Sequence, residues 1–212
     1  LLTAKEVNAK LGRLQTKFAA RDQRMRDVLS VRQGDLSKVF PSMFSEDYPK
    51  PLVANFIDVA ARDLAEAMAP MPSFNCSATN MVSDTQRKQA DIRTRIANFY
   101  VTSSDLPIQM YQGADWYNTY GSMAAIVELD YESNNPRIRL LNPFGVYPEV
   151  DRFGRTVSLT QVVNIDTESL AAQYPEFAQQ ILARENYQPG SPYITMVRYH
   201  DAEQDLIYLP ER

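Results

Sequence analysis

The sequence has little of what secreted, membrane and metal-binding proteins depend on. It holds one cysteine, Cys76, which excludes a disulfide within the chain and a cysteine-rich zinc site. This cysteine usage fits a reducing compartment such as a bacterial cytoplasm. No stretch approaches the roughly 20 consecutive apolar residues of a membrane-spanning helix, and the first residues show no signal-peptide pattern. We therefore expect no membrane partner.

The motifs of common catalytic and phosphate-binding sites are also absent. The chain contains no Gly-x-Gly-x-x-Gly, no Gly-x-x-x-x-Gly-Lys-Ser/Thr and no Gly-x-Ser-x-Gly. A catalytic triad would have to use the only histidine, His200, which lies at a predicted strand end and is expected to be a surface residue. Cys76 is expected to pack as a small apolar residue. We predict no catalytic residue, no metal ligand and no cofactor, and therefore that the chain is not an enzyme.

Two groups of side chains could still bind a ligand. Glu128 and Asp130 lie on one face of a predicted strand, as a cation site or an acid/base pair requires, but a solvated strand end is the expected outcome. Trp116, Tyr117 and Tyr120 could stack on nucleic-acid bases. Since no Lys or Arg occurs between residues 96 and 136, packing in a core or an interface is the better interpretation of these aromatic residues.

Positive charge is scarce except at the start of the chain. The net charge is −4, but residues 1–40 hold nine basic and four acidic residues, and the remainder has a balance of −9. Lys10, Lys17 and Arg24 recur every seven residues, so a helix places them along one edge. This row is the candidate contact with a neighbouring subunit or with DNA; a solvated helix edge is the ordinary alternative.

The first half of the sequence is predicted to be helical. Apolar residues at helical spacing predict a first helix over about residues 3–31, with one narrow stripe from Val7 to Val28. A second helix is predicted over about 51–69, and its wide apolar face predicts deep burial. A Ser83-x-x-Gln86 capping box begins a third helix, which ends near residue 103. Four of its side chains are predicted to point inward: Ile92, Ile96, Phe99 and Tyr100. A fourth helix follows from about residue 105 and ends at Gly121.

Strands dominate after Gly121. Alternating residues predict a strand over about 123–131, a turn, and a second strand over 137–141. A strand over 156–165, a helix capped by Asp166 and split by Pro175, and a hairpin over 193–209 follow. The fold class is therefore α+β, with N-terminal helices packed on a small, mostly antiparallel sheet. We divide the chain into a helical part, 1–121, and a β-rich part, 122–212.

Three segments carry a resemblance to a known family. They are the helix PLVANFIDVAARDLA at 51–65, the helix end YNTYG at 117–121, and the strand segment NPFGVYP at 142–148. In this order the segments resemble the portal proteins of tailed bacteriophages, especially of phages that infect actinobacteria. The chain begins at Leu1 and ends at Arg212, and we expect it to be part of a longer protein. The resemblance implies that this segment forms part of the wing of a portal subunit. The stem, clip and crown would then lie outside this segment.

The resemblance implies a structural function in the virion. Portal proteins form a dodecameric ring at one capsid vertex, where the ring contacts the major capsid protein, docks the terminase and later binds head–tail adaptors. Double-stranded DNA passes through the ring, without sequence preference, during genome packaging and ejection. By this resemblance the protein would assemble in the host cytoplasm and reside at the portal vertex.

Two other functions remain open from the sequence. The chain could be a fragment of a nucleic-acid-processing enzyme whose active residues lie outside this segment. It could also be another virion protein, such as a head–tail connector. A ring of subunits favours the portal, whereas a His/Asp/Cys constellation elsewhere in the full-length protein favours the enzyme.

Overall fold

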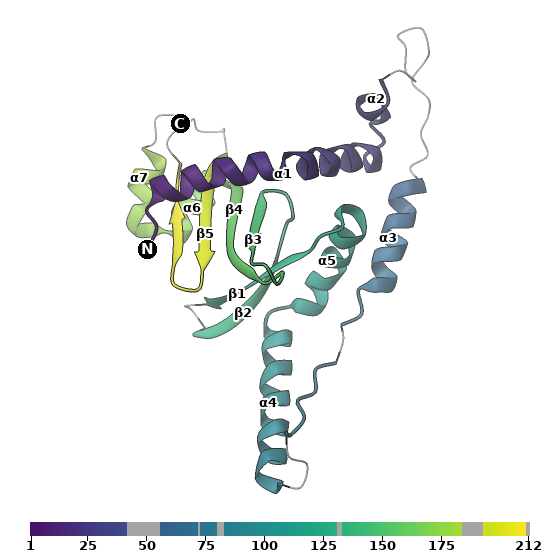
Figure 1. Cartoon of the computed structure of the whole chain (residues 1–212), viewed down its shortest axis with the longest axis vertical. Helices are drawn as coiled ribbons and strands as arrows, with labels where there is room; N and C mark the ends of the chain where they lie inside the picture. Colours follow the sequence, from purple (N-terminus) through teal and green to yellow (C-terminus); the bar gives the residue numbers. More distant parts are fainter. Residues whose placement is uncertain (42–55, 72, 80–82, 131–132, 184–192, 211–212) are drawn as a thin grey trace. The chain divides into compact units, whose positions relative to one another are not determined.

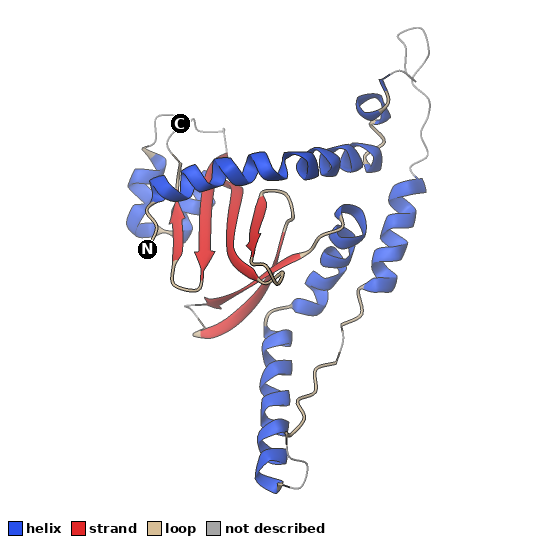
Figure 2. Cartoon of the chain, in the orientation of Figure 1, coloured by secondary structure: helices blue, strands red, loops and turns tan. Residues whose placement is uncertain are grey.

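The computed structural model of the chain describes residues 1–41, 56–71, 73–79, 83–130, 133–183 and 193–210. The fold is α+β, as predicted: helices fill the first half of the chain, and the strands, all antiparallel, form two separate sheets (Figure 2). The chain forms two compact units. The first consists of residues 1–21 and 144–212, and the second of residues 22–143.

The long first helix is present where the sequence predicts it. Helix α1 spans Ala4–Arg32, and its residues up to Arg21 belong to the first unit (Figure 1). The side chains of Val7, Leu11, Leu14 and Met25 are buried, so the predicted narrow stripe is its inward face.

The first unit is built on a four-stranded sheet with the order β3-β4-β5-β6. The strands are β3 Val146–Val150, β4 Thr156–Asp166, β5 Tyr193–Asp201 and β6 Asp205–Tyr208. The predicted C-terminal hairpin is confirmed as β5 and β6.

Helices cover both faces of this sheet. Leu11 and Leu14 of α1 pack with Tyr147 and Val197 on one face. On the other face lie the short helices α6 Thr167–Gln173, η2 Pro175–Phe177 and α7 Ala178–Leu182. Alternation along β5 explains the two cores, because Val197 belongs to the first and its neighbour Met196 to the second. The Asp166 cap is confirmed by a 2.8 Å bond from the Ser169 N–H to its carboxylate.

The second unit contains the remaining elements: α2 Leu36–Val39, α3 Phe56–Met68, α4 Asp84–Ser103, α5 Leu106–Tyr120, β1 Ala124–Asp130 and β2 Asn135–Leu141. Helices α3 and α4 and strand β2 all pack against α5. Gly121 ends α5 in the left-handed conformation that was predicted for it. The side-chain oxygen of Ser83 accepts a bond from the Gln86 N–H and caps α4.

The predicted deep burial of the second helix is wrong. Phe56 and Leu64 are 77 % and 48 % exposed, and the buried residue of α3 is Ala65, on a different face of the helix. The prediction that four residues of α4 point inward is also wrong for Ile92, Ile96 and Phe99, because all three are exposed. The fourth, Tyr100, is partly buried. The apolar pattern located both helices correctly, but their buried residues lie on small-residue faces: Ala65 on α3, which packs against α5, and Ala90 on α4. The part of α3 predicted over residues 51–55 lies outside the described residues.

The boundaries of the two compact units differ from the predicted boundary between residues 121 and 122, because they lie after Arg21 and after Pro143. The change from helices to strands does occur there, since β1 begins at Ala124. The second unit nevertheless includes both strands of the first sheet, because β2 packs with α4 and α5 and pairs with β1.

Candidate functional site

The first residue of the predicted basic row lies in a polar network within the first unit. Lys10 of α1 forms an ion pair with Glu149 of β3. Its ammonium nitrogen also lies 3.3 Å from both the Ser158 hydroxyl and the Tyr199 hydroxyl. The Ser158 hydroxyl donates to Glu149 at 2.6 Å, and the Tyr199 hydroxyl donates to Asp201 at 2.8 Å. One lysine therefore joins α1 to three strands of the sheet.

The charges of this network stabilise one another. Burial acts to lower the pKa of Lys10, but the hydrogen bond and charge of Glu149 outweigh it, so that this pKa is raised. Burial likewise acts to raise the pKa of Glu149, and the bonds from Lys10 and Ser158 outweigh it, so that this pKa is lowered. A lysine held in its charged form cannot accept a proton from Ser158. The arrangement is thus suited to anchoring α1 on the sheet.

The other two residues of the row are exposed. Lys17 lies 5.6 Å from the ring of Phe18, and its charge also helps to lower the pKa of Glu149. Arg24 belongs to the second unit. Lys17 and Arg24 are therefore available to a partner, whereas Lys10 is already engaged within the chain.

Arg21, which interrupts the apolar stripe in the sequence, has a packing function. Its guanidinium carbon lies 4.4 Å from the ring centre of Phe18 and 5.4 Å from that of Tyr147. The two rings contact each other at 6.0 Å. A guanidinium over aromatic faces is stabilised by their electron density, so Arg21 extends the stripe rather than ending it.

The structure does not bring the predicted carboxylate pair together around a shared ligand. Glu128 accepts a 2.9 Å bond from Arg139 of the neighbouring strand. Asp130 accepts a 3.0 Å bond from the Ser133 hydroxyl. Across the described ranges, no group of three or more His, Cys, Asp and Glu side chains is placed to hold a metal ion.

The histidine and the cysteine belong to different compact units. The His200 ring is half-exposed, with its Nδ1 atom 3.9 Å from the Asp205 carboxylate. Cys76 is partly buried, and its backbone N–H donates to the Thr94 hydroxyl of α4 at 2.9 Å.

Sequence reasoning missed an arginine at the predicted aromatic cluster. Arg32 donates to Asp58 of α3 at 2.7 Å and to Asp115 of α5 at 2.8 Å. Burial raises the pKa of the nearby Tyr120. No basic residue is close to this cluster in sequence, so only the fold reveals that α1 supplies one. With both carboxylates engaged, the guanidinium ties three helices together.

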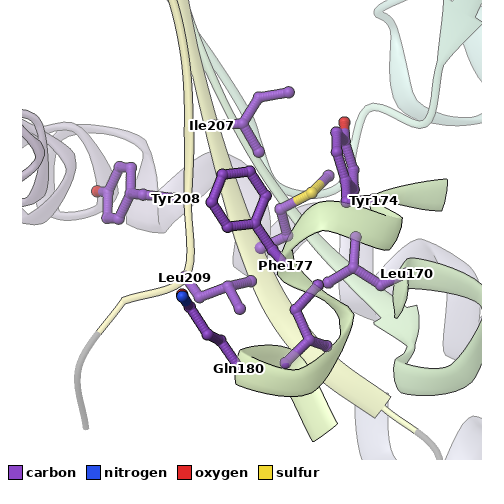
Figure 3. A pocket seen from close by; sticks show the side chains of 9 residues that line it. Leu170, Tyr174, Phe177, Gln180, Ile207, Tyr208 and Leu209 are labelled. Carbon is purple, nitrogen blue, oxygen red and sulfur yellow. The ribbon is translucent and has the colours of Figure 1, made fainter. Parts of the chain in front are cut away.

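A pocket of about 420 Å³ lies between the short helices α6 and α7 and the last two strands (Figure 3). Its lining is mostly apolar and includes no charged residue: Leu170, Tyr174, Phe177, Gln180, Ile181, Met196, Ile207, Tyr208 and Leu209. The ring of Tyr208 points away from the other side chains and packs in the core beneath α1. The described lining of the pocket suits an apolar group.

The most unusual surface of the second unit is apolar. Helices α3 and α4 expose large side chains along their lengths: Phe56, Ile57, Val59, Leu64, Met68, Ile92, Ile96 and Phe99. Large contiguous apolar patches are uncommon on monomeric proteins, which makes these side chains a candidate interaction surface. Within the described parts of the chain, no helix is both long and apolar enough to cross a membrane.

Comparison with known proteins gives no assignment. No family model matches the chain, and no curated protein matches its sequence.

Proposed function

We propose that this protein is a structural subunit of a bacteriophage portal ring. The observation that carries this proposal is the apolar surface of α3 and α4, which an isolated subunit leaves in water and a larger assembly would bury. The kind of assembly, a portal ring, is inferred from the sequence resemblance of residues 51–65, 117–121 and 142–148. The chain then belongs to the wing of a dodecamer at one capsid vertex.

In this function the protein acts as a structural scaffold and catalyses no reaction. The ring provides the conduit for genome packaging and ejection and the attachment point for the terminase and the head–tail adaptors. Polar side chains such as Lys10 and Arg32 are engaged in ion pairs and hydrogen bonds that hold elements together. This engagement supports a scaffold function.

The proposal is tested by the oligomeric state of the full-length protein. We expect native mass spectrometry and negative-stain electron microscopy to show closed rings of identical subunits. A protein that remains monomeric at high concentration would overturn the proposal. A hydrolytic activity on nucleic acid that survives removal of every contaminating nuclease would favour the enzyme alternative.

A further inference from the structure

Helices α3 and α4 each present an apolar stripe to solvent. On α3 the stripe consists of exposed residues that share one side of the helix: Phe56, Ile57, Ala60, Leu64, Ala67 and Met68. On α4 it consists of Ile92, Ile96 and Phe99, at spacings of four and three. Phe99 is 56 % exposed, and this exposed fraction is similar to that of Ile57 on the α3 stripe, which is 55 % exposed.

The two stripes are edged by opposite charges. On α3, Asp63 and Glu66 lie along one edge of the stripe, beside Phe56 and Ala67. The helix as a whole carries three acidic residues and one basic residue.

On α4, Lys88 and Arg95 lie along one edge of the stripe, beside Ile92 and Phe99. Asp91 follows on the far side of this edge, yet the helix carries four basic and two acidic residues. The edge that borders the stripe is therefore basic, and it is exposed.

We propose that α3 of one copy of this chain packs against α4 of the next copy. The contact buries both apolar stripes and sets the acidic edge of α3 against the basic edge of α4. Contacts between two α3 helices or two α4 helices would instead oppose like charges, which costs several kcal/mol at an interface. Both complementary surfaces lie on the same unit of the same chain, so a second copy is the partner that supplies them.

The geometry of this contact has a consequence for assembly. When two copies share a single α3–α4 contact, the contact is heterologous and leaves one free α3 and one free α4 at the ends of the oligomer. Such a contact adds further copies and forms a ring when its rotation closes. This inference rests on the proposed ring function and identifies the surfaces that form the ring.

The test uses two charge-reversed variants of the whole protein. The first carries Asp63→Lys and Glu66→Lys; the second carries Lys88→Glu and Arg95→Glu. Each variant alone opposes like charges, so we expect its self-association to weaken at least about tenfold. Ring content is measured by native mass spectrometry and by size-exclusion chromatography with light scattering.

An equal mixture of the two variants distinguishes the proposed pairing from general surface damage. The reversed α3 of the first variant then meets the reversed α4 of the second, and the two unchanged helices also meet. We expect the mixture to form rings of alternating subunits, and a chain with all four substitutions to form rings alone. As a control, Glu176→Lys with Glu203→Lys changes charge equally at exposed positions of the other unit and should leave assembly unchanged.

The outcomes separate this inference from the proposed function. If the wild type forms rings and either variant alone does so equally well, the α3–α4 contact is wrong and the ring proposal stands. If neither variant forms rings alone and their mixture does not form rings either, the pairing of these two edges is wrong. If the wild type never associates, the proposed function and this contact fall together.

Discussion

Gly145 shows how a single residue fixes a strand segment. Its φ of +76° lies in the left-handed region, and a Cβ there would lie 2.4 Å from the carbonyl oxygen of Val162. The Val162 N–H in turn donates to the Gly145 carbonyl at 2.8 Å. The segment Asn142–Pro148 therefore needs glycine at this position both for its backbone conformation and for its close approach to β4.

A glycine pair tests this explanation. Gly154 has a similar φ, but a Cβ added there would meet open space. We therefore expect Gly154→Ala to lower the free energy of unfolding by about 1–2 kcal/mol through backbone strain alone. Gly145→Ala should cost about 1–3 kcal/mol more, because the methyl group meets backbone. Urea-unfolding midpoints measure both. Equal losses for the two variants would mean that the contact with Val162 relaxes freely.

The ion pair between Lys10 and Glu149 should make stability depend on pH in the acid range. The pKa of Glu149 is lowered from its ordinary 4.5, so its stabilisation is present above that value and is lost as the pH falls through the folded-state pKa. We expect Lys10→Met to lose about 1–2 kcal/mol at neutral pH. The difference from wild type should shrink as the pH falls below about 4.5.

The matched control for this prediction is Lys17→Met. Lys17 is exposed and makes the smallest of the contributions that lower the pKa of Glu149. Its replacement should therefore change the unfolding free energy by less than about 0.5 kcal/mol between pH 3 and pH 7. Urea unfolding of the three proteins between pH 3 and pH 7 decides the matter. A difference between Lys10→Met and wild type that stays constant with pH would show that Lys10 stabilises through packing of its stem alone.

The sequence identified Lys10 as a candidate contact residue, but it could not identify the residues that Lys10 contacts within the chain. The seven-residue spacing correctly places Lys10 on one side of α1. Glu149, Ser158 and Tyr199 come from three strands far along the chain, and pairing over such separations depends on how the sheet is ordered. Arg32 was missed for the same reason, because Asp58 and Asp115 reach it only after three helices pack.

At the scale of elements, local signals located the helices and strands well. The stripe of α1, Gly121 at the end of α5, the Asp166 cap and the break at Pro175 all have causes within a few residues of one another. Burial was harder to predict. An apolar stripe shows which face of a helix avoids water, but not whether the same chain or another one covers it.

Neighbouring residues on α3 test this distinction. Leu64 is exposed, so Leu64→Ala should change the stability of the dilute monomer by less than about 0.5 kcal/mol. Ala65 is fully buried, and Ala65→Leu should cost about 1–3 kcal/mol through overpacking. Leu170→Ala, in the core of the other unit, should cost about 2–5 kcal/mol and serves as the reference.

Thermal or urea unfolding at a concentration without self-association is the suitable measurement, because association would stabilise the wild type selectively. A loss for Leu64→Ala comparable to that for Leu170→Ala would place the α3 stripe in the core of the monomer. The proposed contact with a second copy would then lose its apolar component.

At the scale of the whole molecule, the order of elements along the chain differs from their grouping in space. The first strand begins at Ala124, just after the boundary between residues 121 and 122, and the short helices α6, η2 and α7 follow it. The compact units instead combine α1 up to Arg21 with the last four strands, and the middle helices with the first two strands. Composition changes along the chain and cannot reveal that a helix from one end packs with strands from the other.

The remaining exposed residues of the basic row give the last prediction. The structure leaves Lys17 and Arg24 exposed while Lys10 is paired, so the relevant variant is Lys17→Glu with Arg24→Glu. The rest of the chain has a balance of −9, and a ring supplies that acidic surface at high local concentration. We therefore expect the row to contact an adjacent subunit. The variant's rings, formed without DNA, should dissociate at a lower salt concentration than wild-type rings.

The competing partner is DNA, and salt alone does not distinguish the two, because both contacts weaken as counterions screen them. The decisive comparison is between ring stability without DNA and DNA retention by intact rings. Wild-type-like rings with weaker, sequence-independent DNA binding would assign the row to DNA. No change in either measurement would mean that Lys17 and Arg24 form an ordinary solvated edge, and the effect of charge on assembly would then come from the α3 and α4 edges.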